Sequence, residues 1–340
     1  MVKSMKHKDT DNQEHLRDAV AHFTASFRQI ESEISRIVVG QTETIRLALT
    51  AIFAGGHVLL EGAPGLGKTL LVKSIAQTLG LSFHRIQFTS DLMPSDVTGT
   101  QVLTEDEHGL RSFVFKQGPI FANIVLADEI NRTGPKTQSA LLEAMEEHQV
   151  SVLGTTHRLP EPFFVLATQN PIELEGTYPL PEAQLDRFLF KIVVSSPTST
   201  ELKEILFRTT GTQDIKLTPV FKASETAKII MEMRALVRRV VIAPQLEDLL
   251  IGTMFALTPG SKTCTEAAAE YVRFGPGPRG AQAVLMAAKV FALLDGRLNL
   301  SYEDIRAAIV PSLRHRLILN YQAEAEGVVA DQLISEIFRK

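Results

Sequence analysis

The stretch from Val58 to Leu79, VLLEGAPGLGKTLLVKSIAQTL, decides the fold class of this chain. It begins with a short apolar run, Val58 to Leu60, typical of a buried strand, and ends in a helical pattern from Leu70 to Leu79. Between them, Gly62 to Thr69 fills every position of the pattern GxxxxGK[ST]. Glycines let successive backbone N–H groups point into one concavity, and the helix N-terminus adds partial positive charge. The stretch therefore predicts a loop that binds the phosphates of a nucleoside triphosphate.

Outward from this loop, short apolar runs alternate with helical stretches as far as Val194. Four further strand candidates are Phe83 to Phe88, Ile124 to Ala127, Phe163 to Ala167 and Phe188 to Val194. Strands that alternate with helices indicate a parallel sheet covered on both faces. We therefore expect an α/β core with a five-stranded parallel sheet. Two other segments, Val97 to Phe115 with a charged tip at residues 105–109 and Gln149 to Leu159 with a turn at Gly154, are expected to form inserted hairpins.

Three segments are expected along the chain. Residues 1–37 are a polar tail followed by an amphipathic helix from about Leu16 to Ile37. The nucleotide-binding core spans residues 38–196 and ends in the turn-rich stretch Ser195 to Thr200. Beyond it strand signals nearly vanish, and helical patterns predict a small all-α domain over residues 197–340.

Composition and charge limit the possible functions. The 340 residues are 44% hydrophobic and 22% charged, which is ordinary globular usage and argues against disorder. The formal net charge is −4, so nothing draws the whole chain to nucleic acid or anionic lipid, and a nucleic-acid partner is not expected. Cys264 is the single cysteine, which excludes a disulfide framework and favours a cytoplasmic location. The sequence predicts no secretory leader and no membrane span.

The apolar run Ile124 to Ala127 ends in two adjacent acids, Asp128 and Glu129. Carboxylates at the end of a buried strand, after a phosphate loop, indicate hydrolysis of the nucleotide rather than binding alone. Asp128 and the hydroxyl of Thr69 would hold Mg²⁺, and Glu129 would polarise the attacking water. Lys68 would reach the β- and γ-phosphates, so a nucleoside triphosphate and Mg²⁺ are the expected ligands. The simpler alternative is that the two acids cap the start of a helix.

Four blocks of sequence follow one another along the chain: Glu61 to Thr69, Asp128 to Arg132, Ala167 to Pro171 and Pro181 to Phe188. Together they resemble the MoxR family of AAA+ ATPases. Their order and spacing agree with the family from about Val38 to Leu317, and the two expected hairpins lie where its helix-2-insert clade carries insertions. The sequence departs from the family at Thr133-Gly134, which replaces a more usual small residue and proline. It departs again at Gly275 to Arg279, a variant of the sensor-2 loop in the helical lid domain.

The resemblance implies roles for several residues. Asn170 corresponds to sensor 1, which orients the attacking water, and Arg187 to an arginine finger that reaches the γ-phosphate held by a neighbouring subunit. Arg279 corresponds to sensor 2, acting within its own chain. The implied nucleotide contacts are Gly40, Gln41, Gly62, Ala63, Pro64, Gly65, Leu66, Gly67, Lys68, Thr69, Leu70, Asp128 and Arg279. Simpler alternatives remain: an Asn-Pro turn at Asn170, an exposed ion pair at Arg187, and an ordinary helix-start residue at Arg279.

The same resemblance implies a Mg²⁺-dependent ATPase that forms a homo-oligomeric, hexameric ring. It would remodel a protein partner in a chaperone-like role, often a partner with a von Willebrand A domain. Two other functions stay open. A nucleotide-gated scaffold with negligible turnover would not need both Glu129 and Arg187. A DNA motor or chelatase-type subunit would share the inserted hairpins, but no strong basic stripe supports it.

Overall fold

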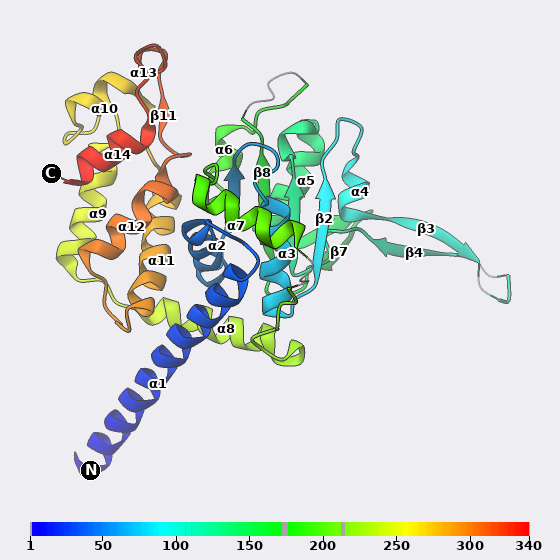
Figure 1. The fold of residues 1–340 in the computed structure, drawn as a ribbon, viewed down its shortest axis with the longest axis horizontal. Coiled ribbons are helices and arrows are strands. Elements are labelled where there is room, and N and C mark those ends of the chain that lie inside the picture. Colours follow the sequence, from blue (N-terminus) through cyan, green and yellow to red (C-terminus); the bar gives the residue numbers. More distant parts are fainter. Residues whose placement is uncertain (1, 106, 110, 172–175, 212–214, 340) are drawn as a thin grey trace. The chain divides into compact units, whose positions relative to one another are not determined.

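The computed structural model describes residues 2–105, 107–109, 111–171, 176–211 and 215–339 (Figure 1). Its contacts divide the chain into two compact units. The α/β unit comprises residues 33–48 and 56–227, and the helical unit comprises the residues up to 32, residues 49–55 and those from 228 onward. Three helices contribute residues to both units: α1 (Val2–Ser35), α2 (Thr42–Ala54) and α8 (Ala223–Arg239).

Five parallel strands form the sheet of the α/β unit. In spatial order they are β2 (Phe83–Gln87), β5 (Ile124–Asp128), β8 (Phe164–Gln169), β1 (His57–Glu61) and β9 (Phe188–Val193). All neighbouring pairs are parallel. Each strand agrees within two residues with one predicted from an apolar run, so the expected α/β class is confirmed. The central strands read as continuous apolar runs because both faces of the sheet are covered.

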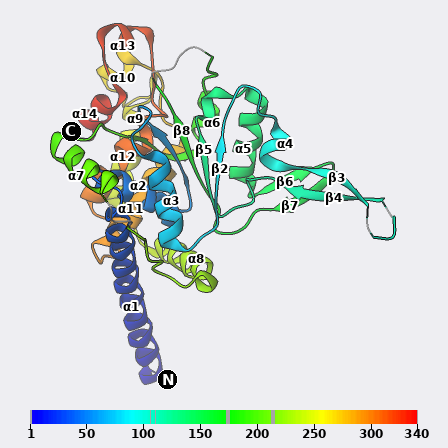
Figure 2. The same ribbon diagram turned by 45° about the vertical axis from the view of Figure 1, so that its right-hand side comes forward.

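Helices lie on both faces of this sheet. Figure 2 shows α3 (Lys68–Leu79), which follows the phosphate loop, on one side and α5 (Pro135–Glu147) on the other. Part of the core lies between α5 and the sheet, where Val125, Leu141 and Val165 are completely buried. Burial stabilises the fold by roughly 1.5–3 kcal/mol for each such side chain. Three short helices complete this unit near the strands: α4 (Pro94–Thr98), η1 (Ile130–Arg132) and α6 (Glu182–Leu185).

The α/β unit extends beyond residue 196, as far as residue 227. The domain boundary expected between residues 196 and 197 stays a prediction. Helix α7 (Ser199–Thr210) begins at a capping box in which Thr198 and Glu201 bind each other's backbone N–H groups. Arg208 on this helix donates hydrogen bonds to the carbonyls of Ser35, over 3.2 Å, and Arg36, over 2.5 Å. These bonds connect α7 to residues 33–48 of the same unit.

Both expected hairpins are present and lie outside the five-stranded sheet. One pairs β3 (Gly99–Glu105) with β4 (Arg111–Gln117), and the other pairs β6 (Gln149–Val152) with β7 (Thr155–Arg158). The ring of Phe115 on β4 stacks on His157 of β7, with 3.8 Å between ring centroids. This contact joins the two hairpins. Asp106 and Leu110, at the charged tip, lie outside the described residues.

The helical unit confirms the expected all-α character with small additions. Its remaining elements are α9 (Pro244–Ala256), α10 (Glu266–Tyr271), β10 (Val272–Phe274), α11 (Pro278–Leu294), α12 (Tyr302–Leu313), β11 (Ile318–Leu319), α13 (Tyr321–Glu326) and α14 (Ala330–Arg339). The antiparallel pair β10–β11 and helix α13 were not expected, because such short elements leave no periodic pattern in a sequence. Helix α1 begins at Val2, well before Leu16, since no proline or glycine interrupts its polar first half. None of the helices in the described residues combines the length and apolar character needed to span a membrane.

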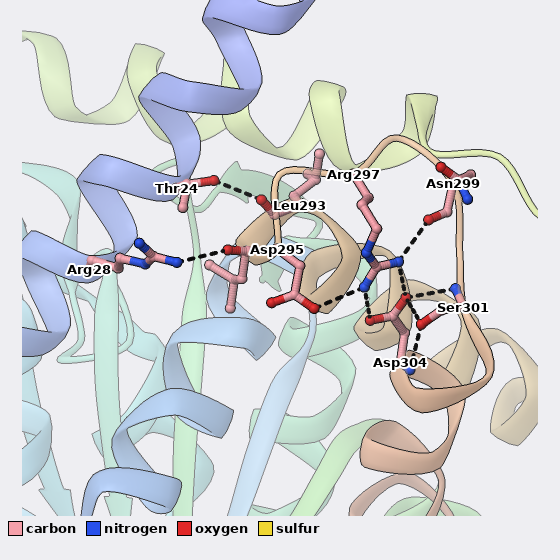
Figure 3. A network of polar contacts seen from close by, with 9 residues as sticks. Thr24, Arg28, Leu293, Asp295, Arg297, Asn299, Ser301 and Asp304 are labelled. Carbon is pink, nitrogen blue, oxygen red and sulfur yellow. Dashed lines mark hydrogen bonds and ion pairs between the residues drawn. The ribbon is translucent and has the colours of Figure 1, made fainter.

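A polar network fixes the end of α11 within this unit (Figure 3). Thr24 on α1 donates to the carbonyl of Leu293 over 2.7 Å, which satisfies one of the acceptors left open at a helix C-terminus. Just beyond α11, Arg297 pairs bidentately with Asp304 over 2.8 Å and with Asp295 over 2.9 Å. The hydrogen bonds that Arg297 donates to Asp304 raise the pKa of the guanidinium above its ordinary value, so it is a permanent charge that holds the α11–α12 connection.

Candidate functional site

The carboxyl ends of the parallel strands bring three predicted segments together. The phosphate loop follows β1, Asp128 ends β5, and Asn170 directly follows β8. Because β8 lies between β5 and β1, Asn170 leaves the sheet between the acids and the phosphate loop. Ligands of open parallel sheets bind in the crevice at this end of the strands. We call this region the carboxyl end of the sheet.

The phosphate loop has the left-handed backbone positions that its glycines permit. Gly65 and Gly67 have φ of 82° and 75°, in the region where a side chain would be strained. The Nζ atom of Lys68 donates to the carbonyls of Gly62, over 2.5 Å, and Ala63, over 3.3 Å, so this side chain folds back over the loop. Of the other predicted loop contacts, Gly62 is buried, Leu66, Gly67 and Thr69 are half-buried, and Pro64, Gly65 and Leu70 are exposed.

The segment before α2 lies beside this loop. Gln41 donates from Nε2 to the carbonyl of Leu66 over 2.7 Å. Gly40 has φ of 74°, and a Cβ atom there would clash with the side chain of Glu201. Gln41 therefore contacts the phosphate loop through its side chain, and the nucleotide contacts of Gly40 and Gln41 stay predictions.

Lys68 lies in the field of both acids. Partial burial lowers its pKa, while the negative charges of Asp128 and Glu129 oppose that shift. The lysine and the two carboxylates therefore form one electrostatic group. A bound phosphate would add negative charge and favour the charged form of the lysine.

The hydroxyl of Thr168 joins the two acids and is completely buried. It donates to Oδ1 of Asp128 over 2.7 Å and accepts from the backbone N–H of Glu129 over 2.8 Å. Glu129 has φ of 57°, a left-handed conformation that costs a non-glycine residue about 1–3 kcal/mol. The bond to Thr168 offsets part of that cost and fixes where the Glu129 side chain leaves the backbone.

Two side chains of β2 bind the same acids. Arg85 donates to Oδ2 of Asp128 from Nε, over 3.0 Å, and from Nη2, over 2.7 Å, and its Nη2 also donates to Oε1 of Gln87. Gln87 in turn donates from Nε2 to Oε2 of Glu129 over 3.0 Å, and Arg132 approaches the same oxygen at 3.3 Å. The carboxylates are thus connected by hydrogen bonds on the β2 side as well as through Thr168.

Behind the acids, Gln138 of α5 fixes the turn that follows Glu129. Its completely buried amide donates to the carbonyls of Ile130, over 3.3 Å, Thr133, over 3.0 Å, and Tyr178, over 3.1 Å. Holding three carbonyls on two segments, this side chain keeps η1 in one place relative to α5.

Thr69 and Asp128 have the chemistry of a magnesium site. Mg²⁺ prefers oxygen ligands, and at nucleotide sites it uses only one or two protein groups together with phosphates. A hydroxyl after the phosphate loop and a carboxylate that is 8% exposed suit this arrangement. Among the described residues, no group of three or more His, Cys, Asp or Glu side chains could hold a metal without such phosphates.

Arg187 lies at the opposite end of the sheet. It directly precedes β9, whose first residue Phe188 pairs with His57, the first residue of β1. Its guanidinium donates to the carbonyl of Leu142 over 2.8 Å and forms an ion pair with Glu146 of α5. It lines a hollow of about 580 Å³ between α5, β6 and α6, whose wall also includes Glu143 and Glu147. We call this region the amino end of the sheet.

The structure therefore brings together some predicted site residues and separates others. Lys68, Asp128 and Glu129 share the carboxyl end, where Asn170 is 6% exposed. Arg187 lies at the amino end of the same sheet, and Arg279 is exposed in the first turn of α11 in the helical unit.

Four residues that contact the predicted site residues have no predicted role in the sequence motifs: Arg85, Gln87, Thr168 and Glu146. One signal was available for the first two. Arg85 and Gln87 alternate with apolar residues on a strand that ends beside two acids, and alternation puts them on one face. Nothing in the sequence marks Glu146 among the other acids of α5.

The chain is similar to known proteins in sequence and in fold. Residues 57–190 match the model of the ATPase family associated with various cellular activities, and residues 264–337 match that of an AAA lid domain. The Bacillus subtilis protein YeaC is 43% identical, with 89% of this chain and 90% of that protein covered. Chaperone MoxR1 of Mycobacterium tuberculosis is 40% identical, with 90% and 79% covered. A crystal structure of a candidate ATPase from Cytophaga hutchinsonii has a TM-score of 0.88 at 40% identity, covering 99% of this chain and 98% of that one.

The five-stranded parallel sheet, the phosphate loop after β1 and the helical lid domain define the class of AAA+ ATPases. Within that class, the chain belongs to the MoxR family. The expected family is thus confirmed, whereas its helix-2-insert clade stays a prediction.

Proposed function

We propose that this chain is a Mg²⁺-dependent ATPase that hydrolyses ATP to ADP and phosphate between neighbouring copies of itself in a hexameric ring. The cycle would remodel a protein partner in the cytoplasm, in the manner that the name of Chaperone MoxR1 suggests for that relative. A partner with a von Willebrand A domain is the class that the family resemblance favours.

The separation of Arg187 from the phosphate loop is the observation that carries this proposal. The six residues of β9 separate the two ends of the sheet by roughly 20 Å, at about 3.3 Å per residue. No arginine side chain can cross that distance, so Arg187 cannot reach a phosphate bound by its own loop. A guanidinium that serves as an arginine finger must therefore come from a second copy.

The residues at the carboxyl end have complementary roles in this proposal. The loop N–H groups and Lys68 bind the phosphates, and Thr69 and Asp128 hold the metal. When bound, Mg²⁺ would neutralise charge on the β- and γ-phosphates. Asn170 would position the attacking water, and Arg279 would contribute from the lid domain as sensor 2.

Glu129 is the proposed base, and its present contacts define what catalysis requires. Gln87 and Arg132 both donate to its Oε2. To accept a proton from water, the carboxylate must turn an oxygen away from these donors. The same contacts favour the second candidate function, a nucleotide-gated scaffold with negligible turnover, because an oxygen held by two donors cannot accept a proton from water until those bonds break. Nothing in the described residues favours a DNA motor or chelatase-type subunit.

A mixing experiment tests the shared site. We expect Arg187→Ala and Glu129→Gln each to bind ATP and to hydrolyse it poorly when pure. Mixed rings contain interfaces in which the intact Glu129 of one copy meets the intact Arg187 of the next, so turnover should partly recover. Absence of recovery in rings shown to be mixed would contradict the shared site. Negligible turnover of the wild-type chain, alone and with a partner, would favour the scaffold.

A further inference from the structure

A cation of the protein itself binds the carboxylate that is proposed to hold Mg²⁺. Two nitrogen atoms of Arg85 donate to one oxygen of Asp128, Oδ2, over 2.7 and 3.0 Å. The other oxygen, Oδ1, accepts from Thr168. Among the described residues, three hydrogen bonds therefore reach this carboxylate, and the two from Arg85 come from a positively charged donor.

The position of Arg85 follows from the strand register. β2 is parallel to β5, and Gln87 lies opposite Asp128. Arg85, two residues earlier, leaves β2 on the same face, so its long side chain reaches along the strand to the carboxylate. Gln87 accepts a hydrogen bond from the same guanidinium and holds it in this direction.

Electrostatics make Arg85 and Mg²⁺ competitors. The side chain of Asp128 is 11% exposed, and a carboxylate so removed from water is costly without a counter-charge. Arg85 supplies that charge by direct contact while no metal is bound, and the charge of Lys68 adds to it. A hydrated Mg²⁺ at the same carboxylate would place two cations against one anion, where they repel each other. The Arg85 side chain is 47% exposed and can therefore turn into solvent without leaving a buried charge.

We propose that Arg85 is an exchangeable counter-ion of Asp128, which stabilises the metal-free site and which Mg²⁺ must displace when nucleotide binds. This inference rests on the proposed function, because it takes Asp128 to be the Mg²⁺ ligand. It assigns to β2 a role in setting how tightly the metal-nucleotide complex is held.

The test compares Arg85→Ala with wild type in the full-length chain. A fluorescent, non-hydrolysable ATP analogue is titrated in excess Mg²⁺ and in EDTA, and thermal unfolding is followed in both conditions. Without Arg85 as a competitor, the Mg²⁺ complex of the analogue should bind about fivefold more tightly, as expected for loss of a partly exposed charge pair. The metal-free variant should unfold at a lower temperature than wild type, and Mg²⁺ with the analogue should remove that difference.

Two further variants control the experiment. Arg85→Lys keeps a positive charge without the second donor and should lie between wild type and Arg85→Ala. If Arg85→Ala does not fold, Arg85→Lys still carries the test. Arg111→Ala removes an equally charged residue from the β3–β4 hairpin, where it pairs with Glu105, and should leave analogue binding unchanged in both conditions.

The outcomes separate this inference from the proposed function. Weaker or unchanged binding of the Mg²⁺-analogue complex to Arg85→Ala, with a thermal loss that persists in Mg²⁺, would show that Arg85 is only structural and overturn the inference. A wild-type chain that binds the analogue equally well in EDTA and Mg²⁺ would instead contradict the metal site of the proposed function.

Discussion

Each end of the sheet holds an arginine that is neutralised by an acid of the same unit. At the carboxyl end Arg85 pairs with Asp128, and at the amino end Arg187 pairs with Glu146 and the carbonyl of Leu142. The first pair lies at the proposed metal site of its own chain, whereas the second lies roughly 20 Å from any phosphate that chain could bind. In the proposed mechanism, the ion pair at the carboxyl end competes with a metal ion, whereas the ion pair at the amino end holds Arg187 until a second copy binds.

The largest expected effect comes from removing Arg187 at the amino end of the sheet. We expect Arg187→Ala to lower ATP turnover about 10³- to 10⁵-fold, because an arginine finger stabilises charge that develops in the transition state. The dissociation constant for ATP should change less than about threefold, since the phosphate loop is remote. Steady-state turnover and equilibrium binding of the assembled protein provide the measurements. A loss of binding as large as the loss of turnover would place Arg187 in its own nucleotide site.

The next effect addresses the carboxyl end. Thr168→Val keeps the shape of the side chain but removes the hydroxyl that binds Asp128 and the N–H of Glu129. Leaving buried groups without partners costs about 1–3 kcal/mol, so the free energy of unfolding should fall by that amount. Turnover should fall on the order of tenfold because Glu129 is no longer fixed. Thr168→Ser keeps the hydroxyl and should retain most of the free energy of unfolding and most of the turnover. Denaturant unfolding and turnover assays measure the two quantities.

A smaller effect would sharpen the contrast between the two arginines. Glu146→Gln removes the charge that holds Arg187 within its own chain and keeps a side chain of equal size. If Arg187 acts on a neighbouring copy, the variant should reach half-maximal turnover at a protein concentration about two- to fivefold lower than wild type does. Turnover measured over a dilution series gives this concentration for both proteins. A shift to higher concentration would mean that Glu146 positions Arg187 for catalysis.

The smallest effect concerns pH at the carboxyl end. Burial lowers the pKa of Lys68, so the nucleotide-free protein loses this positive charge at a lower pH than an ordinary lysine would. Affinity for ATP should therefore decline by a few fold as the pH rises into the alkaline range. Lys68→Arg stays charged there and should show a flatter profile. Binding titrations across that range would test this, and parallel profiles for both proteins would exclude Lys68 as the cause.

The local sequence pattern was enough to predict the strands and the main motifs. Apolar runs such as Ile124 to Ala127 predict buried strands wherever they occur, because a strand covered on both faces has no polar side to show. The phosphate loop could be predicted in the same way, because its glycines and Lys68 lie within one short stretch. By contrast, the three-residue strand β10 and the six-residue helix α13 are too short to leave a period.

The sequence by itself determined the fold class, the family and the segment proposed to bind phosphate, because each depends on short contiguous motifs and on their order along the chain. Only the tertiary structure decided that Arg85 faces Asp128 and that Arg187 is held by Glu146 at the far end of the sheet. Pairings of this kind join residues about 40 positions apart, and the order and register of the strands set them. Strand order is a property of the whole folded chain, which no local stretch of sequence encodes.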